Sequence, residues 1–136
     1  MSRPVLLTVD DSSLQRRALT ELFAAYDCEV LQAENGAVGL AMIREHRPDL
    51  VLLDCDMPVL DGIGLLQELR ADPAIRGTSV IMLTANSAPA TLAAVARLGV
   101  RDFVPKPHDG PALAAKVARW IRLMPRANSI LPAGDA

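Results

Sequence analysis

The sequence lacks the features that mark several large classes of protein. Half of its residues are hydrophobic (51%), yet no apolar run approaches the roughly 18 residues that a membrane-spanning helix needs. Met1-Ser2-Arg3-Pro4 leads into the first apolar run without a signal segment. Cys28 and Cys55 form no C-x-x-C pair, and a net charge of −2 with scattered Lys and Arg leaves no basic stripe. We therefore expect a cytoplasmic protein with two free thiols that contacts neither membrane nor nucleic acid directly.

The 136 residues suit one domain, in which short apolar runs alternate with segments of helical period. This alternation predicts an α/β fold, with a parallel sheet covered by helices on both faces. The predicted strands span 4–9, 28–33, 49–54, 79–84 and 101–105. The predicted helices span 13–25, 36–46, 62–71, 88–98 and 109–124.

The composition of the strands predicts their order. The first, third and fourth are nearly continuous apolar runs that suit the middle of a sheet, whereas the second is mixed and suits an edge. Right-handed crossovers then favour a doubly wound sheet in the order 2-1-3-4-5, a flavodoxin-like three-layer sandwich. In the last helix Leu113, Val117, Trp120, Ile121 and Met124 form a stripe expected to face the core. We expect a domain over 1–124 and a flexible tail over 125–136.

Three carboxylates follow two of the central strands. Asp10 and Asp11 close Val5-Leu6-Leu7-Thr8-Val9, and Asp54 closes Leu50-Val51-Leu52-Leu53. Neighbouring parallel strands would bring these charges together, where two charges about 4 Å apart repel by roughly 4 kcal/mol. A cation is therefore expected, and ligation by oxygen alone indicates Mg²⁺, with Mn²⁺ as a possible substitute.

Two more polar residues end later strands. Thr84 follows Val80-Ile81-Met82-Leu83, and Lys106 follows Phe103-Val104-Pro105. Because the carboxyl ends of parallel strands meet at one edge, the acids, the hydroxyl and the ammonium are expected to share one pocket. In such a pocket one carboxylate can attack phosphorus while the metal, Lys and hydroxyl neutralise phosphoryl oxygens.

The chain resembles a response-regulator receiver domain of two-component signalling, a likeness that runs from about residue 4 to residue 124. In order, the matching pieces are Asp10-Asp11, the loop from Asp54 through Met57-Pro58 to Asp61-Gly62, Thr84-Ala85 and Lys106-Pro107. Each piece alone is weak evidence. Together, in this order and at the ends of the expected elements, they form a specific pattern.

The resemblance implies a role for each of these residues. Asp54 would accept a phosphoryl group from a histidine kinase or a histidine phosphotransfer protein. Lys106 would pair with Asp54 before the reaction and with a phosphoryl oxygen after it, and the Lys106–Pro107 peptide is expected to be cis. Thr84 would turn its hydroxyl toward the phosphoryl group, and Phe103 would move inward as the switch aromatic. Mg²⁺ would be held by Asp10, Asp11, Asp54 and the backbone carbonyl of Asp56.

The resemblance also bears on output. The protein would be a stand-alone receiver that catalyses only its own phosphorylation and dephosphorylation, and it would signal by binding an unknown target or serve as a phosphate sink. It would be a monomer or a weak, phosphorylation-dependent dimer formed through Arg97 and Asp102. The reporting face would include Ala93, Arg97, Asp102, Phe103, Lys116 and Arg119.

Other interpretations have less support. The run Val51 to Asp56 also resembles the nucleophile loop of haloacid-dehalogenase-type phosphatases, but there the acidic metal pair normally follows the nucleophile. A pure interaction module would not need the acids, Thr84 and Lys106 together. Taken singly, Asp61 is expected to cap a helix, Asp56 to face solvent, and both His46 and His108 to lie on exposed segments.

Overall fold

The fold is a single parallel sheet of five strands in the predicted order β2-β1-β3-β4-β5. The computed structural model describes residues 3–57, 60–85 and 88–126. The strands are β1 (Val5–Val9), β2 (Glu29–Ala33), β3 (Leu50–Asp54), β4 (Val80–Thr84) and β5 (Asp102–Pro105). The helices are α1 (Ser13–Phe23), α2 (Gly36–His46), α3 (Gly62–Ala71), α4 (Pro89–Arg97) and α5 (Gly110–Val117).

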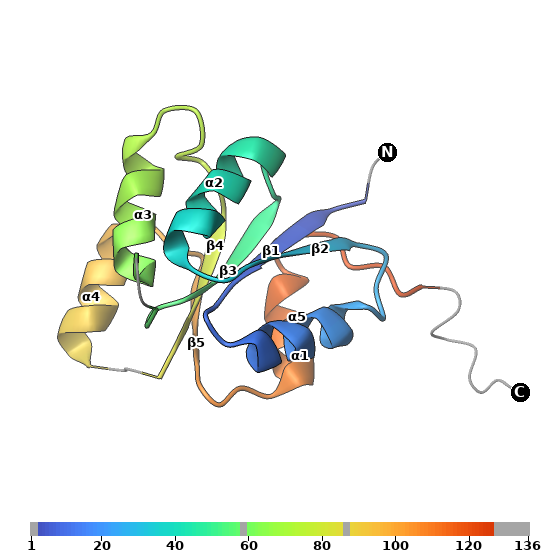
Figure 1. The fold of residues 1–136 in the computed structure, drawn as a ribbon. Helices are drawn as coiled ribbons and strands as arrows, with labels where there is room; N and C mark the ends of the chain where they lie inside the picture. The colour runs from blue at the N-terminus through green and yellow to red at the C-terminus, as the bar shows by residue number, and fades with distance from the viewer. Residues whose placement is uncertain (1–2, 58–59, 86–87, 127–136) are drawn as a thin grey trace, which may run out of the picture.

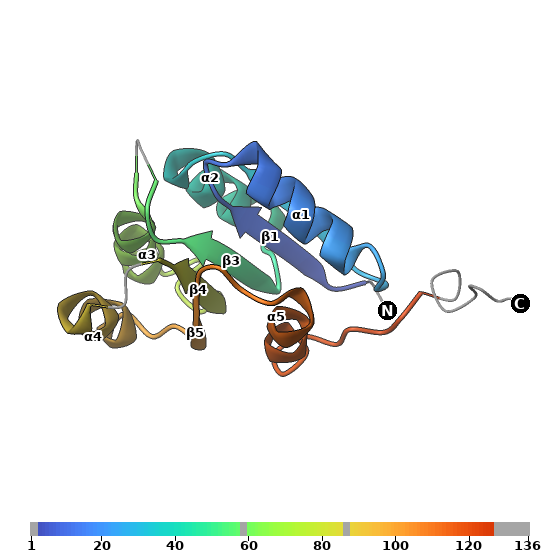
Figure 2. The same ribbon diagram turned by 90° about the horizontal axis from the view of Figure 1, so that it is seen from below.

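The helices cover both faces of the sheet, as the alternation of elements predicts. Helices α1 and α5 lie on one face and α2, α3 and α4 on the other (Figures 1 and 2). Each face has its own apolar cluster. One is built around Leu6, Phe23, Leu52, Leu83 and Val117, and the other around Val9, Ile43, Leu53, Leu66 and Met82. The sheet therefore separates an α1–α5 core from an α2–α3–α4 core.

Polar side chains cap three of the five helix N-termini. Ser12 accepts a hydrogen bond from the Gln15 amide, Asn35 from Val38, and Asp61 from Gly64. At α5 Asp109 occupies the N-cap position without a side-chain cap bond. Gly99 follows α4 with φ of 77°, a left-handed conformation that other residues adopt at a cost. Local polar chemistry thus fixes where the core-facing segments begin and end.

The prediction for the last helix was wrong at its C-terminal end. Helix α5 stops at Val117, so Trp120 and Met124, which are 41% and 52% exposed, do not continue the core stripe of Leu113 and Val117. The chain instead runs beside the segment that follows α1, where the Met124 carbonyl accepts the Asp27 amide. Pro125 disfavours a helical conformation for Met124, the residue before it. The hydrogen bond from the Asp27 amide satisfies the Met124 carbonyl, which makes no helical hydrogen bond.

The same strand-like contact extends to Arg126. Pro125 forms an isolated antiparallel bridge with Tyr26, and the Arg126 amide donates to the Ala25 carbonyl. Pro125 and Arg126 were expected to begin a flexible tail over 125–136. The rest of that segment, residues 127–136, lies outside the described part of the chain. No helix in the described part is long and apolar enough to cross a membrane.

Candidate functional site

Four strands deliver polar side chains to the same edge of the sheet. Asp10 follows β1, Asp54 ends β3, Thr84 ends β4 and Lys106 follows β5. The order of the strands places β1 and β3 side by side, so the acids of both meet at the point where the sheet reverses its winding. Asp10, Asp54 and Thr84 are only 2%, 3% and 4% exposed. Burial of these groups is costly and requires partners.

The three carboxylates predicted to hold a metal are brought together. Asp10, Asp11 and Asp54 each offer one oxygen, and these oxygens lie within 4.8 Å of one another. Asp10 Oδ1 accepts the Ser12 amide at 2.9 Å, whereas Asp10 Oδ2 is buried and has no hydrogen bond within the described residues. A buried carboxylate oxygen that accepts no hydrogen bond, beside two other carboxylates, fits a hard divalent cation.

Lys106 supplies the positive charge that this cluster has in the structure. Its Nζ lies 2.8 Å from Asp54 Oδ1 and 3.5 Å from Asp10 Oδ2. Burial lowers the pKa of Lys106, but the hydrogen bond from Lys106 to Asp54 and the attraction of both acids outweigh burial and raise that pKa. The Lys106–Pro107 peptide is cis, as predicted. Lys106 is thus a permanent cation between two acids.

Asp54 is less acidic than an ordinary carboxyl. Burial raises its pKa, the hydrogen bond from Lys106 opposes that shift, and repulsion from Asp10 adds to it. The Asp56 amide approaches Asp54 Oδ1 at 3.4 Å. Asp56 itself is exposed, as expected. A further cation at this position would oppose this rise in the pKa of Asp54.

The loop after β3 folds back tightly on the acceptor strand. The Gly62 amide donates to the Cys55 carbonyl at 3.0 Å, and a Cβ on Gly62 would lie 2.5 Å from the Asp54 carbonyl oxygen. Only glycine allows this close approach. Asp61 caps α3, as predicted, rather than turning to the acids. Pro58, predicted to shape this turn, lies outside the described residues.

Thr84 and Phe103 lie on the other side of the sheet from Asp54. Side chains alternate along a strand, so Thr84 follows Val80 and Met82 onto the α2–α3–α4 face, where Phe103 packs against the same core. Asp54 follows Leu50 and Leu52 onto the α1–α5 face. The two predicted switch residues, Thr84 and Phe103, therefore lie on the same face of the sheet. Asp54 lies on the opposite face.

One residue of the site, Arg16, was missed by sequence reasoning. Arg16 donates from a terminal nitrogen to the Asp10 carbonyl at 2.6 Å and from Nε to Gln32 at 3.2 Å. Nothing in the sequence distinguishes Arg16 from Arg17. Its position one turn after the Ser12 cap, on the side of α1 that faces β2, becomes evident only in the fold.

His108 was predicted to be exposed and is half-buried. Its Nε2 lies 2.8 Å from Gln15 Nε2, and its Nδ1 is buried without a hydrogen bond in the described part of the chain. Because the amide nitrogen of Gln15 can only donate, Nε2 of His108 is the acceptor in this contact. The contact joins the start of α1 to the loop after Lys106.

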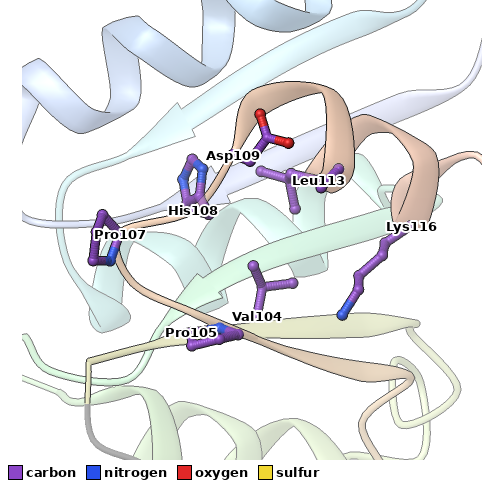
Figure 3. Close-up of a pocket in the computed structure, with 8 residues that line it drawn as sticks. Val104, Pro105, Pro107, His108, Asp109, Leu113 and Lys116 are labelled. Atoms are coloured by element: carbon purple, nitrogen blue, oxygen red, sulfur yellow. The ribbon is translucent and has the colours of Figure 1, made fainter.

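A hollow of about 190 Å³ lies beside this loop, between β5 and α5 (Figure 3). Lys116 lines it and pairs with Asp102 at 3.6 Å, while its Nζ also approaches the Phe103 carbonyl at 3.4 Å. The hollow is lined by Val104, Pro105, Pro107, His108, Asp109, Ala112, Leu113 and Lys116. Of the predicted reporting face, Lys116 lines the hollow and Asp102 pairs with Lys116.

Comparisons with known proteins identify the family to which the chain belongs. Residues 6–118 match the family described as "Response regulator receiver domain". Protein PilH of Pseudomonas aeruginosa is 35% identical over 79% of this chain and 89% of its own length. The probable transcriptional regulator ycf27 of Porphyridium aerugineum is 33% identical over 95% of this chain, which spans only 52% of that relative.

Solved structures give the same result for the fold. CheY of Borrelia burgdorferi, determined in a complex with CheX, BeF₃ and Mg²⁺, superposes with a TM-score of 0.80 at 26% identity. The superposition covers 87% of this chain and 89% of that one. The five-stranded order therefore belongs to a known architecture.

Proposed function

The chain belongs to the response-regulator receiver family of two-component signalling, and we propose that it accepts a phosphoryl group on Asp54 and signals by a change of conformation. The observation that carries the proposal is the position of Asp54. It is buried at the sheet edge, 2.8 Å from a lysine ammonium and within 4.8 Å of oxygens of Asp10 and Asp11. The donor would be a histidine kinase or a histidine phosphotransfer protein.

Mg²⁺ would be held by Asp10, Asp11, Asp54 and the Asp56 carbonyl, with Mn²⁺ as a substitute. The fit rests on the three converging carboxylates and on the buried Asp10 Oδ2, which accepts no hydrogen bond in the described part of the chain. The bound ion would neutralise charge on the phosphoryl oxygens. A net increase in positive charge at the site would also bring the pKa of Asp54 back down, which would favour the nucleophilic carboxylate.

The chain's own groups would perform the remaining steps. An Asp54 carboxylate oxygen attacks phosphorus, the bond from phosphorus to the donor's histidine nitrogen breaks, and the imidazole leaves with that electron pair. Lys106 would then move its hydrogen bond from the carboxylate to a phosphoryl oxygen. The reaction is a transfer between proteins, and the chain turns over no small substrate beyond the hydrolysis of its own acyl phosphate.

Output would pass from Thr84 and Phe103 to the face around β5. The Asp102–Lys116 pair and the hollow beside it give that face a mixed polar and apolar surface, which suits a protein partner. The partner would be either a separate target or a kinase that uses the chain as a phosphate sink. A weak, phosphorylation-dependent dimer through Arg97 and Asp102 is the other use of the same face.

Acetyl phosphate with Mg²⁺ tests the acceptor. Intact mass should increase by one phosphoryl group, the adduct should be lost in mild base as an acyl phosphate is, and Asp54→Asn should abolish it. Asp56→Asn, an exposed acid two residues away, is the matched control and should still be labelled. Base-stable labelling, or undiminished labelling of Asp54→Asn, would contradict the assignment.

A further inference from the structure

The backbone of Asp10 is held by groups from outside its own strand. Its amide donates to the Ala33 carbonyl of β2 at 3.1 Å, and its carbonyl accepts Arg16 Nη1 at 2.6 Å. Its Oδ1 accepts the Ser12 amide at 2.9 Å. These bonds account for each polar group of Asp10 except Oδ2, which has no hydrogen bond within the described residues.

Arg16 is itself anchored on the neighbouring strand. Its Nε donates to Gln32 Oε1 at 3.2 Å, and Gln32 of β2 is paired in register with Thr8 of β1. Arg16 is half-buried, whereas Arg17 beside it is exposed. A guanidinium presents its N–H donors in a rigid plane, so two contacts from different nitrogens fix its orientation. The Arg16 side chain therefore bridges β2 and the end of β1.

This bridge acts on the peptide that joins the two acids of β1. The Asp10 carbonyl belongs to the Asp10–Asp11 peptide, which is planar, so a hydrogen bond to its oxygen orients the whole unit. The direction of the Asp11 side chain follows from that orientation. Because Asp11 is exposed, core packing does not fix its position. The contact with Arg16 is thus a means of holding Asp11 toward the other two acids.

We infer that Arg16, anchored on Gln32, is a positioning residue for the metal site. It orients the Asp10–Asp11 peptide so that both carboxylates meet that of Asp54, and oxygens of these three acids lie within 4.8 Å of one another. The inference rests on the proposed function and adds a residue that is not itself a ligand. Ligands held in place before binding raise affinity because less conformational freedom is lost when the ion binds.

Positioning and charge predict opposite effects of removing Arg16. The guanidinium is a cation close to the acids, so its charge alone would repel a second cation. If charge were its whole effect, removal of the guanidinium would strengthen Mg²⁺ binding. Removal of a group that orients two ligands should instead weaken Mg²⁺ binding. The sign of the change therefore identifies the role.

Calorimetric titration of the full chain with Mg²⁺ measures this change. We expect Arg16→Met to weaken Mg²⁺ binding about tenfold, at the lower end of the range for groups that orient metal ligands. Arg16→Lys, which keeps the charge but not the planar two-point contact, should give an intermediate affinity. Arg17→Met is the matched control and should stay within about twofold of the wild type, because an exposed charge is screened. Equal or tighter binding by Arg16→Met would overturn the inference.

Gln32→Ala tests the anchor without removing a charge. Gln32 is exposed on the edge strand, so this variant serves even if Arg16→Met does not fold. It should weaken Mg²⁺ binding roughly two- to fivefold, the effect of one hydrogen bond, and should have no effect in an Arg16→Met background. Unchanged affinity of Gln32→Ala, or an equal loss in both backgrounds, would overturn the positioning role. A wild-type chain that binds no Mg²⁺ would instead remove the proposed metal site, and with it this inference.

Discussion

Replacing Lys106 by Met should expose the electrostatic cost of the acidic edge. At an effective dielectric near 20, the 2.8 Å contact with Asp54 and the 3.5 Å contact with Asp10 correspond to about 6 and 5 kcal/mol of attraction. Desolvation of the ammonium, whose side chain is 25% exposed, offsets much of this gain. Loss of the cation leaves two buried acids facing each other, and we expect about 2–4 kcal/mol of lost stability at pH 7.5 without divalent ions.

The loss should depend on pH in a defined direction. The raised pKa of Lys106 keeps it charged throughout the acidic and neutral range, so the titrating group is the acid. A carboxyl whose pKa is raised by folding costs stability as the pH increases above its ordinary value of 3.8. Removing Lys106 extends this cost to higher pH, because its hydrogen bond opposes the rise in the pKa of Asp54. The difference between variant and wild type should therefore shrink as the pH falls toward 4.

Urea unfolding at pH 7.5 and at pH 4.5 measures this difference. Lys116→Met is the matched control, because Lys116 also pairs with one acid but its side chain is 37% exposed and the pair is 3.6 Å long. The control should lose less than about 1 kcal/mol. Added Mg²⁺ should restore part of the stability of Lys106→Met by binding only the folded state. Equal losses in the two variants, or a Lys106→Met loss that does not change with pH, would refute the reasoning.

Three further predictions concern the loop after β3, the predicted metal ligands and the hydrogen bonds of Arg70. Gly62→Ala should lower the melting temperature and cost about 1–3 kcal/mol, because its Cβ would overlap backbone, whereas Gly77→Ala, with nothing within 4 Å, should be nearly neutral; equal melting temperatures would contradict the close approach. Asp11→Ala should weaken Mg²⁺ binding in calorimetric titration and leave the metal-free fold at least as stable; unchanged affinity would exclude Asp11 as a ligand. Arg70→Met should destabilise by about 2 kcal/mol or more in urea unfolding, since Arg70 donates four hydrogen bonds to backbone carbonyls, while the exposed Arg76→Met should change little; similar losses would refute this role.

The strands and the acidic edge could be predicted because each depends on local signals. Continuous apolar runs place β1, β3 and β4 in the centre, and parallel pairing then brings Asp10 next to Asp54 without any knowledge of tertiary contacts. The polar caps Ser12 and Asn35 likewise act within one turn of helix. Their physics is contained in sequences of a few residues.

The errors arose where a distant segment decides the outcome. The helical period of the sequence continues through Trp120 and Met124. Residues 124–126 instead pair with the backbone of residues 25–27, and helix α5 ends at Val117. Trp120 instead has the Arg101 guanidinium 4.8 Å from its ring centre. His108 is covered because Gln15, 93 residues earlier, reaches its ring. No local pattern reports contacts across such separations.

The two apolar cores have a consequence for engineering and for divergence among related chains. Leu113 and Val117 pack in the α1–α5 core, whereas Cys55 and Phe103 belong to the other. Substitutions in separate clusters without shared partners combine nearly additively. One half of the molecule can therefore be restabilised or recruited for new contacts while Phe103, the proposed switch aromatic, keeps its surroundings. The sheet would thus make thermal robustness and the threshold of the proposed switch two separately adjustable properties of one small domain.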